Sequence, residues 1–205
     1  MNKTTSYEVL YRSLKHLVGL TDDDWNLLKP HLVPRSYKKH EHLLETDQAS
    51  GYFWFVAQGL IRNYYLTSAG KEFNKSFIPA PDFCGSIREM VQDLPSRFSI
   101  QALEESHTLA VPIPWYREII QTHATFARLA RLQIENLAIR KEDREEELLL
   151  DDATTRYLKF CQEYPTLEAR IPAYHIASYL GITEVALSRL KAKLKTKEPV
   201  AAAKD

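Results

Sequence analysis

The chain has few cysteines and glycines, no long apolar run and no excess of charge of either sign. Its two cysteines, Cys84 and Cys161, are too few for a disulfide framework, so we expect a reducing compartment, the cytoplasm. No segment is long and apolar enough to cross a membrane, and the N-terminus lacks the layout of a signal peptide. The balance of 27 basic against 27 acidic residues excludes a global attraction to nucleic acid, so any such attraction must be local.

What is present describes a soluble globular chain. Its 205 residues are 44% hydrophobic and 26% charged, with room for one medium-sized domain and a small one. Charge is distributed unevenly along the chain. Residues 142–152 are rich in acids, whereas from Ile171 onward one arginine and five lysines stand against three acidic residues. This separation allows the C-terminal part to meet phosphate.

Four of the six glycines, at positions 51, 59, 70 and 85, punctuate a region of short β-like runs. The expected strands are rich in aromatic and aliphatic residues, and turn signals separate them. They are Tyr52–Ala57, Leu60–Leu66, Glu72–Ile78, Phe98–Leu103 and Thr108–Ile113. Many short strands with frequent turns predict a barrel or jelly roll. Before this region we expect a helical segment that contains Gly19, then a capping box formed by Thr21 and Asp24.

The second half of the chain has helical patterns. We expect helices over Trp115–His123, Thr125–Leu150 and Ala153–Glu163, the last ended by Pro165. The longest has an apolar stripe at spacings of three and four, made of Phe126, Leu129, Leu132 or Gln133, Leu137 and Arg140. Such a stripe is typical either of an ordinary core face or of the seam of a two-helix coiled coil. The pattern alone leaves both possibilities open.

The segment Ile171–Leu194 predicts two short helices joined by a tight turn, the layout of a helix-turn-helix. Pro172 suits the first turn of a helix, where no N–H donor is needed. Ile176, Ala177 and Leu180 then form one apolar face. Gly181 follows where the chain must turn sharply.

The second helix of this segment begins after Thr183, whose side chain can accept an N–H from the first turn. Leu187 and Leu190 are expected to face inward. Four polar side chains stay available outside: Ser188, Arg189, Lys191 and Lys193. An ordinary helical hairpin would show the same periodicity, so the pattern by itself does not prove DNA binding.

The residues of this unit resemble those of the Crp/Fnr superfamily of bacterial transcription regulators. The family-like elements are IASYLGIT at Ile176–Thr183, LSR at Leu187–Arg189, VAQGLIRNYY at Val56–Tyr65, Gly-Lys-Glu at Gly70–Glu72, IQALEES at Ile100–Ser106 and RYLKF at Arg156–Phe160. The resemblance is to the branch common in Bacteroidetes and covers nearly the whole chain.

The resemblance implies an α+β fold with three parts. These are a jelly-roll domain like that of cyclic-nucleotide-binding proteins at residues 1–124, a dimerisation helix at 125–150 and a helix-turn-helix domain at 151–205. It also implies a homodimer that binds an inverted-repeat operator in double-stranded DNA, with RNA polymerase as a further partner. We expect no catalytic residue, no metal site and no cofactor.

The residues expected to meet DNA lie on and before the second helix of the unit. They are Thr183, Glu184, Val185, Ser188, Arg189, Lys191 and Lys193, with Lys195 as a further phosphate contact. An arginine such as Arg189 can grip guanine O6 and N7 together. Many relatives carry glutamate at the position of Val185, whereas the acid here is Glu184. We therefore expect a half-site that differs from the common family consensus.

The effector of the jelly roll is a separate question. The family's phosphate cassette has a glycine-glutamate pair, then an arginine followed by serine or threonine. Here the pairs are Gly85-Ser86 and Arg97-Phe98, so a ribose acceptor and a phosphate donor are missing. We expect that cyclic AMP and cyclic GMP do not switch the protein. The candidate effector-pocket residues are Phe83, Gly85, Ser86, Arg97 and Phe98; another ligand could lie among Phe73, Phe77, Phe83 and the long helix.

Three further readings stay open. Two distant cysteines cannot hold an iron–sulfur cluster, but Cys84 could be a thiol sensor or a buried structural residue. His40, His42 and Glu45 have a spacing close to a cupin metal motif, which would make the chain a metal-binding enzyme. Little chain follows Leu194 to build the usual two-stranded wing, which keeps a binding module without DNA as a third possibility.

Overall fold

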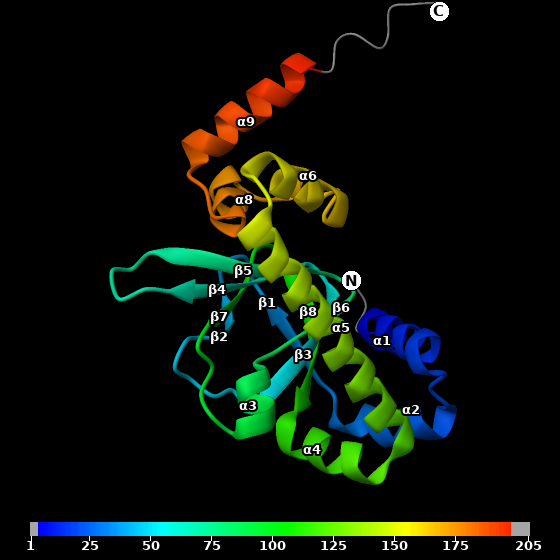
Figure 1. Ribbon diagram of the computed structural model, residues 1–205. Coiled ribbons are helices and arrows are strands. Elements are labelled where there is room, and N and C mark those ends of the chain that lie inside the picture. The colour runs from blue at the N-terminus through cyan, green and yellow to red at the C-terminus, as the bar shows by residue number, and fades with distance from the viewer. Residues whose placement is uncertain (1–3, 198–205) are drawn as a thin grey trace, which may run out of the picture. The chain divides into compact units, whose positions relative to one another are not determined.

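The computed structural model describes residues 4–197, drawn as coloured ribbon in Figure 1. It divides the chain into two units, the first ending at Ala138 and the second beginning at Ile139. The boundaries expected from the sequence, after residues 124 and 150, remain a prediction. The α+β class, with a β-roll followed by a long helix and a helical C-terminal part, is confirmed.

The first unit begins with helices α1 (Thr4–Val18) and α2 (Asp22–Leu28), and a 3-10 turn η1 (Lys29–His31) follows. The predicted capping box is present: Asp24 N–H donates to Thr21 Oγ1 at 3.1 Å, and Thr21 N–H donates to Asp24 Oδ2 at 3.0 Å. The sequence predicted that Gly19 lies inside a helical segment, but the structure places it after the end of α1. It follows α1 at a φ of +59°, because the chain turns there towards α2.

Eight strands in the described part of the chain form two four-stranded antiparallel sheets. One has the order β1-β8-β3-β6 and the other β2-β7-β4-β5. The strands are β1 (Val33–Tyr37), β2 (His42–Leu44), β3 (Tyr52–Gln58), β4 (Leu60–Leu66), β5 (Glu72–Pro79), β6 (Asp82–Cys84), β7 (Ser99–Ala102) and β8 (Ser106–Pro112). The five predicted strands match β3, β4, β5, β7 and β8 with small differences at their ends.

Strand β3 shows why its apolar run is uninterrupted. Phe53 and Phe55 pack into a core shared with α1 and Leu109, on the face of the sheet that the helices cover. Trp54 and Val56 point the other way, into a second core between the two sheets. A strand buried on both faces needs no polar alternation.

The strands that the sequence did not reveal are short or polar. Strand β1 reads VPRSY, and its Pro34 is tolerated because β1 lies at the edge of its sheet. Strands β2 and β6 have three residues each, too few to show a period of two. Helix α3 (Ile87–Gln92) was also not predicted, because six residues give less than two helical turns of pattern.

Helices α4 (Ile113–Thr122) and α5 (Ala124–Leu150) follow the roll. The predicted stripe of α5 is partly a core face, since Phe126 is buried in the helical core and Leu129 and Leu132 pack against it. A different apolar residue, Ile134, is 45% exposed. The first half of α5 therefore uses one face for its own unit and leaves another face open.

The second unit holds four helices after the end of α5: α6 (Ala153–Glu163), α7 (Leu167–Arg170), α8 (Ala173–Leu180) and α9 (Glu184–Lys197). Its buried apolar side chains are Tyr157, Phe160, Leu167, Ile171, Ile176, Ala177, Tyr179, Leu180 and Leu187. Helix α9 continues to Lys197, and residues 198–205 lie outside the described residues. None of the described helices combines the length and the apolarity that crossing a membrane requires.

Candidate nucleic-acid interface

Helix α8 is the buried member of the helical pair. It begins after Pro172, and its predicted apolar face is confirmed, because Ile176, Ala177 and Leu180 are all buried. The small side chain of Ala177 allows another helix to approach closely. The interior of the second unit therefore fixes the position of α8.

The turn after α8 depends on a left-handed residue. Gly181 has a φ of +70°, a conformation that costs a residue with a Cβ atom about 1 kcal/mol or more. Its N–H donates towards the carbonyls of Ala177 and Ser178, and Ile182 N–H donates to Ala177 O at 3.0 Å. These bonds satisfy the last carbonyls of the helix and redirect the chain within two residues.

Helix α9 has the two faces predicted from its sequence. Thr183 Oγ1 accepts the Ala186 N–H at 3.1 Å and so caps the helix. Leu187 is buried and Leu190 is half-buried, so both face the second unit. The exposed predicted residues are Glu184, Val185, Ser188, Arg189 and Lys193, together with Lys195. The structure thus gathers the predicted DNA contacts on one open surface.

Lys191 differs from the other predicted phosphate contacts. Its ammonium forms a 2.6 Å ion pair with Glu168 of α7 and lies 5.7 Å from the centre of the Tyr157 ring. Tyr157 OH donates to the same carboxylate at 2.8 Å. The hydrogen bond from Lys191 holds the pKa of Glu168 below its usual range, against the opposing effect of partial burial. In the free protein Lys191 therefore ties α9 to α6 and α7.

Two arginines that the sequence analysis did not single out hold the C-terminal end of α8. Arg156 donates to Leu180 O at 3.1 Å and to Asp151 O at 2.6 Å. Arg144, in the last part of α5, donates to Tyr179 O, and its guanidinium lies 4.1 Å from the centre of the Tyr179 ring. Cations are favoured at a helix C-terminus, where carbonyls lack partners. Sequence alone gave no sign of which helix end these arginines would reach.

A surface hollow of about 580 Å³ lies beside α9. Its lining combines predicted DNA contacts with small side chains: Ala173, Glu184, Val185, Leu187, Ser188, Lys191, Ala192 and Lys195. The hollow is continuous with the exposed face of α9. This part of the second unit is therefore both concave and lysine-bearing.

The candidate effector residues of the β-roll do not converge on one pocket. Ser86 is fully buried, and its hydroxyl accepts the Glu89 N–H at 3.4 Å as the N-cap of α3. At Gly85 an added Cβ would come within 2.6 Å of Phe53 Cβ, so this glycine is needed for close packing. Phe83 packs against the rings of Phe53 and Phe55 in the helical core.

Arg97 and Phe98, the second pair of the expected cassette, also make contacts of other kinds. Arg97 has a side chain that is 67% exposed and forms a 3.4 Å contact with Asp47. The neighbouring Phe98 is buried, with the Lys75 ammonium 3.7 Å from its ring centre and Tyr65 packed edge-on. An exposed arginine paired to a surface carboxylate is not preorganised for a buried phosphate.

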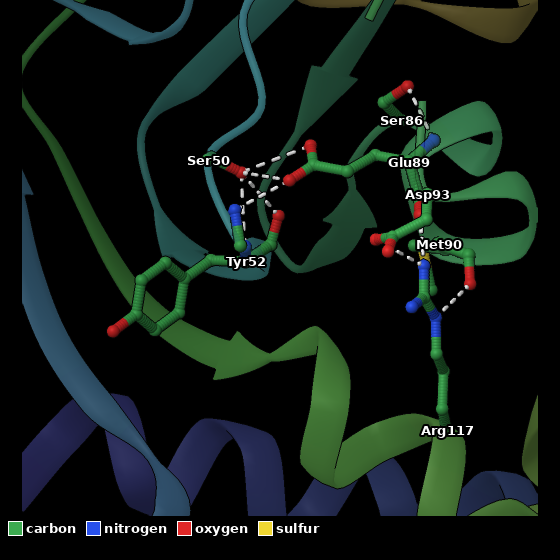
Figure 2. A network of polar contacts seen from close by, with 8 residues as sticks. Ser50, Tyr52, Ser86, Glu89, Met90, Asp93 and Arg117 are labelled. Atoms are coloured by element: carbon green, nitrogen blue, oxygen red, sulfur yellow. Dashed lines mark hydrogen bonds and ion pairs between the residues drawn. The ribbon is translucent and has the colours of Figure 1, made fainter. Parts of the chain in front are cut away.

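The acid of helix α3 is already used inside the protein, as Figure 2 shows. The buried Glu89 carboxylate accepts the Gly51 N–H at 2.5 Å and the Ser50 hydroxyl at 3.3 Å, both just before β3. Arg117 of α4 donates to Glu89 O at 2.6 Å, and to Met90 O and Asp93 Oδ1. Helix α3 is held between β3 and α4, and its carboxylate is not free for a ribose. The residues present therefore do not fit a cyclic nucleotide.

Cys84 lies in β6 and is buried in the core between the sheets. Burial raises the pKa of its thiol far above the usual range, which keeps the thiol protonated. A protonated, inaccessible thiol reacts slowly with oxidants. The structure favours the interpretation of Cys84 as a structural residue.

The cupin-like triad does not form a metal site in the structure. His40 lies in the turn before β2, with a left-handed φ of +71°, rather than on the strand, where it would have pointed the same way as His42. His42 Nε2 lies 2.9 Å from Tyr64 OH, and its Nδ1 lies 3.6 Å from Glu45 Oε1. Across residues 4–197 no three histidine, cysteine or acidic side chains are grouped to hold a metal ion.

A domain family and a curated protein resemble this chain in sequence. The family model of the cyclic nucleotide-binding domain matches residues 34–123. The regulatory protein YeiL of Escherichia coli O157:H7 is 28% identical over 109 residues, which are 53% of this chain and 47% of that protein. The chain thus matches about half the length of this curated relative.

Solved structures match over a larger part of the chain. FixK2 from Bradyrhizobium japonicum gives a TM-score of 0.72 at 21% identity, covering 85% of this chain and 89% of that one. A protein from Eubacterium rectale, described as a putative transcriptional regulator of the Crp/Fnr family, gives 0.71 at 18% identity, covering 87% and 85%. Over 85–87% of the chain the fold is that of these structures, and the predicted resemblance to the Crp/Fnr superfamily is confirmed.

Proposed function

We propose that this protein is a Crp/Fnr-type transcription regulator that binds an inverted-repeat operator in double-stranded DNA as a homodimer. The observation that carries the proposal is the pair α8–α9: Leu187 is 1% exposed, while Ser188, Arg189 and Lys193 on the same helix face solvent. This is the arrangement in which a second helix can enter the major groove while the first supports it. The matched relatives that are described as regulators support the same class.

Arg189 is the residue proposed to read a base edge. Its side chain is exposed and carries a fixed fork of donors that matches O6 and N7 of guanine. Thr183, which caps α9, and Ser188, in its second turn, are proposed to anchor the recognition helix. Exposed Val185 and Glu184 lie in the first turn and would set a half-site different from the family consensus.

The proposed dimer uses the open face of α5. Ala127, Ala130, Ile134 and Leu137 repeat at spacings of three and four, the pattern of a coiled-coil seam. This face is distinct from the Phe126, Leu129 and Leu132 side that packs on the first unit. Two recognition helices related by twofold symmetry would meet half-sites about one helical turn of DNA apart, roughly 34 Å.

The proposed regulator acts in the cytoplasm, takes no cyclic nucleotide and carries no catalytic site. A metal-dependent enzyme built on His40, His42 and Glu45 receives no support from their geometry, since His40 lies in a turn and His42 is paired with Tyr64. RNA polymerase is a further proposed partner, through the resemblance alone. The effector of the β-roll, if it uses one, has a different chemistry from cyclic AMP.

The test is selection of bound sequences from random double-stranded oligonucleotides, followed by affinity measurements on the selected site. We expect an inverted repeat. Arg189→Ala should weaken specific binding by about 10-fold or more, in line with 1–3 kcal/mol for a bidentate guanine contact, and should change non-specific binding far less. Arg35→Ala, an exposed arginine in β1, is the matched control and should bind as the unmodified protein does. Equal losses on specific and random DNA would contradict base reading by Arg189.

A further inference from the structure

The N-terminal helices carry a second surface hollow, which the DNA-binding proposal does not use. It has a volume of about 310 Å³ and is lined by Tyr7, Glu8, Tyr11, Asp22, Trp25 and Lys29. This volume is at the small end of the range for sites that bind small molecules. All six residues belong to α1, α2 and η1, within the first unit.

Three aromatic rings form the apolar part of this hollow. Tyr11 meets Trp25 edge-on, with ring centres 5.2 Å apart and planes at 68°, and Tyr7 meets Trp25 at 6.4 Å and 82°. Rings at such angles present faces in different directions around one space. The face of each ring is electron-rich and attracts a cation within about 6 Å of its centre.

The polar groups around the rings include acceptors for a positive charge. Glu8 and Asp22 are exposed carboxylates in the lining. Tyr11 OH donates to Asp22 Oδ1 at 2.6 Å, and this charge-assisted bond increases the electron density of the Tyr11 ring. The Lys15 ammonium of the same helix donates to Tyr11 OH at 3.4 Å and lies 5.4 Å from the centre of that ring, so a cation is already accommodated beside Tyr11.

We propose that this aromatic hollow binds the methylated ammonium group of a small molecule. A quaternary ammonium has no N–H donors, so an apolar lining leaves none of its groups unpaired. It is also weakly hydrated, and aromatic faces recognise it through cation–π attraction. Lys29 at the same hollow can pair with a carboxylate on the ligand, which favours a zwitterion with a trimethylammonium group.

The experiment measures binding to the full chain by calorimetry and by tryptophan fluorescence. The probes are tetramethylammonium, trimethylglycine and 3,3-dimethyl-1-butanol, which has the shape of a trimethylammonium ligand but no charge. We expect both charged probes to bind and to change the Trp25 emission, and the neutral probe to bind at least about fivefold more weakly, as expected for lost cation–π attraction. Equal binding of the neutral probe, or no binding of the charged ones, would overturn the proposal.

Two variants test the site, so the result does not depend on a single substitution that could impair folding. Tyr7→Leu removes a ring, and Glu8→Gln removes only a charge from an exposed side chain, so the second variant is expected to fold normally. Both should weaken tetramethylammonium binding severalfold. Glu105→Gln, an exposed acid in the turn before β8, is the matched control and should leave binding unchanged. If Glu8→Gln and Glu105→Gln behave alike, the cation does not bind in this hollow.

Lys29→Gln separates the two kinds of charged ligand. Removing this cation should strengthen tetramethylammonium binding, because a like charge is lost from the lining. The same substitution should weaken trimethylglycine binding, because the partner of the ligand carboxylate is lost. Changes in the same direction for both probes would contradict the assigned role of Lys29. DNA binding is measured in parallel, and its loss or retention bears only on the proposed regulator function.

Discussion

The ion pair between Lys191 and Glu168 shows how one contact changes the meaning of a residue. By type and position Lys191 resembles Lys193, and the sequence predicts a phosphate contact for both. In the structure Lys193 is exposed, whereas Lys191 is held by a carboxylate and lies over a ring. A lysine that is already neutralised releases few counterions when DNA arrives.

The salt dependence of DNA binding should therefore distinguish these two lysines. Lys193→Met should reduce the slope of log affinity against log salt by about 0.9, the value for one lost phosphate contact. Lys191→Met should leave the slope nearly unchanged, and Glu168→Gln should make it steeper by freeing the Lys191 ammonium. Fluorescence titrations on random duplex DNA at several salt concentrations give the slopes. Equal effects of the two lysine variants would mean that Lys191 leaves Glu168 on the DNA.

The same pair predicts a dependence of stability on acid pH. The hydrogen bond from Lys191 lowers the pKa of Glu168 in the folded protein below its ordinary value of 4.5. A lowered pKa in the folded state means that the stabilisation is complete above the unfolded pKa and is lost as pH falls through the folded one. The unmodified protein should thus exceed Glu168→Gln in stability by a constant amount above pH 4.5, and this difference should shrink below it.

Denaturant unfolding of both proteins between neutral pH and pH 3 measures that difference. Glu105→Gln, with its mostly exposed side chain, serves as the control and should show no comparable trend. A difference between the unmodified protein and Glu168→Gln that grows on acidification would contradict the assigned direction.

At the scale of elements, the sequence predicted best where pattern and burial coincide. Strand β4 and helix α6 were predicted with the bounds that the structure shows, because an apolar run between turn residues and a capped amphipathic helix each have a local cause. Strands β2 and β6 depend on their partners across the sheet, such as the pairing of Trp54 with Cys84, and three residues cannot encode that.

The helical pair α8–α9 was predicted almost residue by residue, whereas the effector cassette was predicted only by what it lacks. Capping, the left-handed glycine and the apolar spacing of α8 and α9 are local signals. The roles of Glu89 and Arg117 are not, since each joins segments more than twenty residues apart. The sequence showed that Ser86 cannot replace a glutamate, but it did not show that Glu89 is tied to Gly51 and Ser50.

Helix α5 carries the prediction that belongs to this scale. Replacing Ile134, which is 45% exposed, by glutamate places charges in the proposed seam and should convert the dimer to a monomer. Asn136→Glu adds the same charge two residues along, on the opposite side of the helix, and should leave the dimer intact. Sedimentation at micromolar concentration distinguishes the two. An Ile134→Glu protein that stays dimeric would contradict the seam.

For the whole molecule, the central question is whether the β-roll controls the second unit through a cyclic nucleotide. The matched domain family takes its name from that ligand, but Arg97 is paired with Asp47 at the surface and Ser86 is buried as a helix cap. A buried anionic phosphate and a ribose hydroxyl left without partners would cost several kcal/mol, on the order of 1–3 for a neutral group and more for the charge.

We therefore expect that neither cyclic AMP nor cyclic GMP changes the affinity for the selected operator. Calorimetry with each nucleotide, and operator titrations in their presence, measure this directly. Binding tighter than about 10 μM, which corresponds to roughly 7 kcal/mol, together with stronger operator binding, would show that the cassette works with a different set of contacts.

The contact from Arg144 to the end of α8 bears on how such proteins can be recombined. Exchanging recognition modules between regulators is easiest when each module carries all of its own supports. A junction at Asp151, where α5 has ended, would separate α8 from Arg144, which donates to Tyr179 O, although Arg156 and its bond to Leu180 O would be kept. A junction near Ile139 retains both arginines in the transferred piece. Chimaeras joined near Ile139 should therefore keep the transferred α8 and α9 in place. Chimaeras joined at Asp151 should lose affinity for DNA, although the sequence of α9 is unchanged.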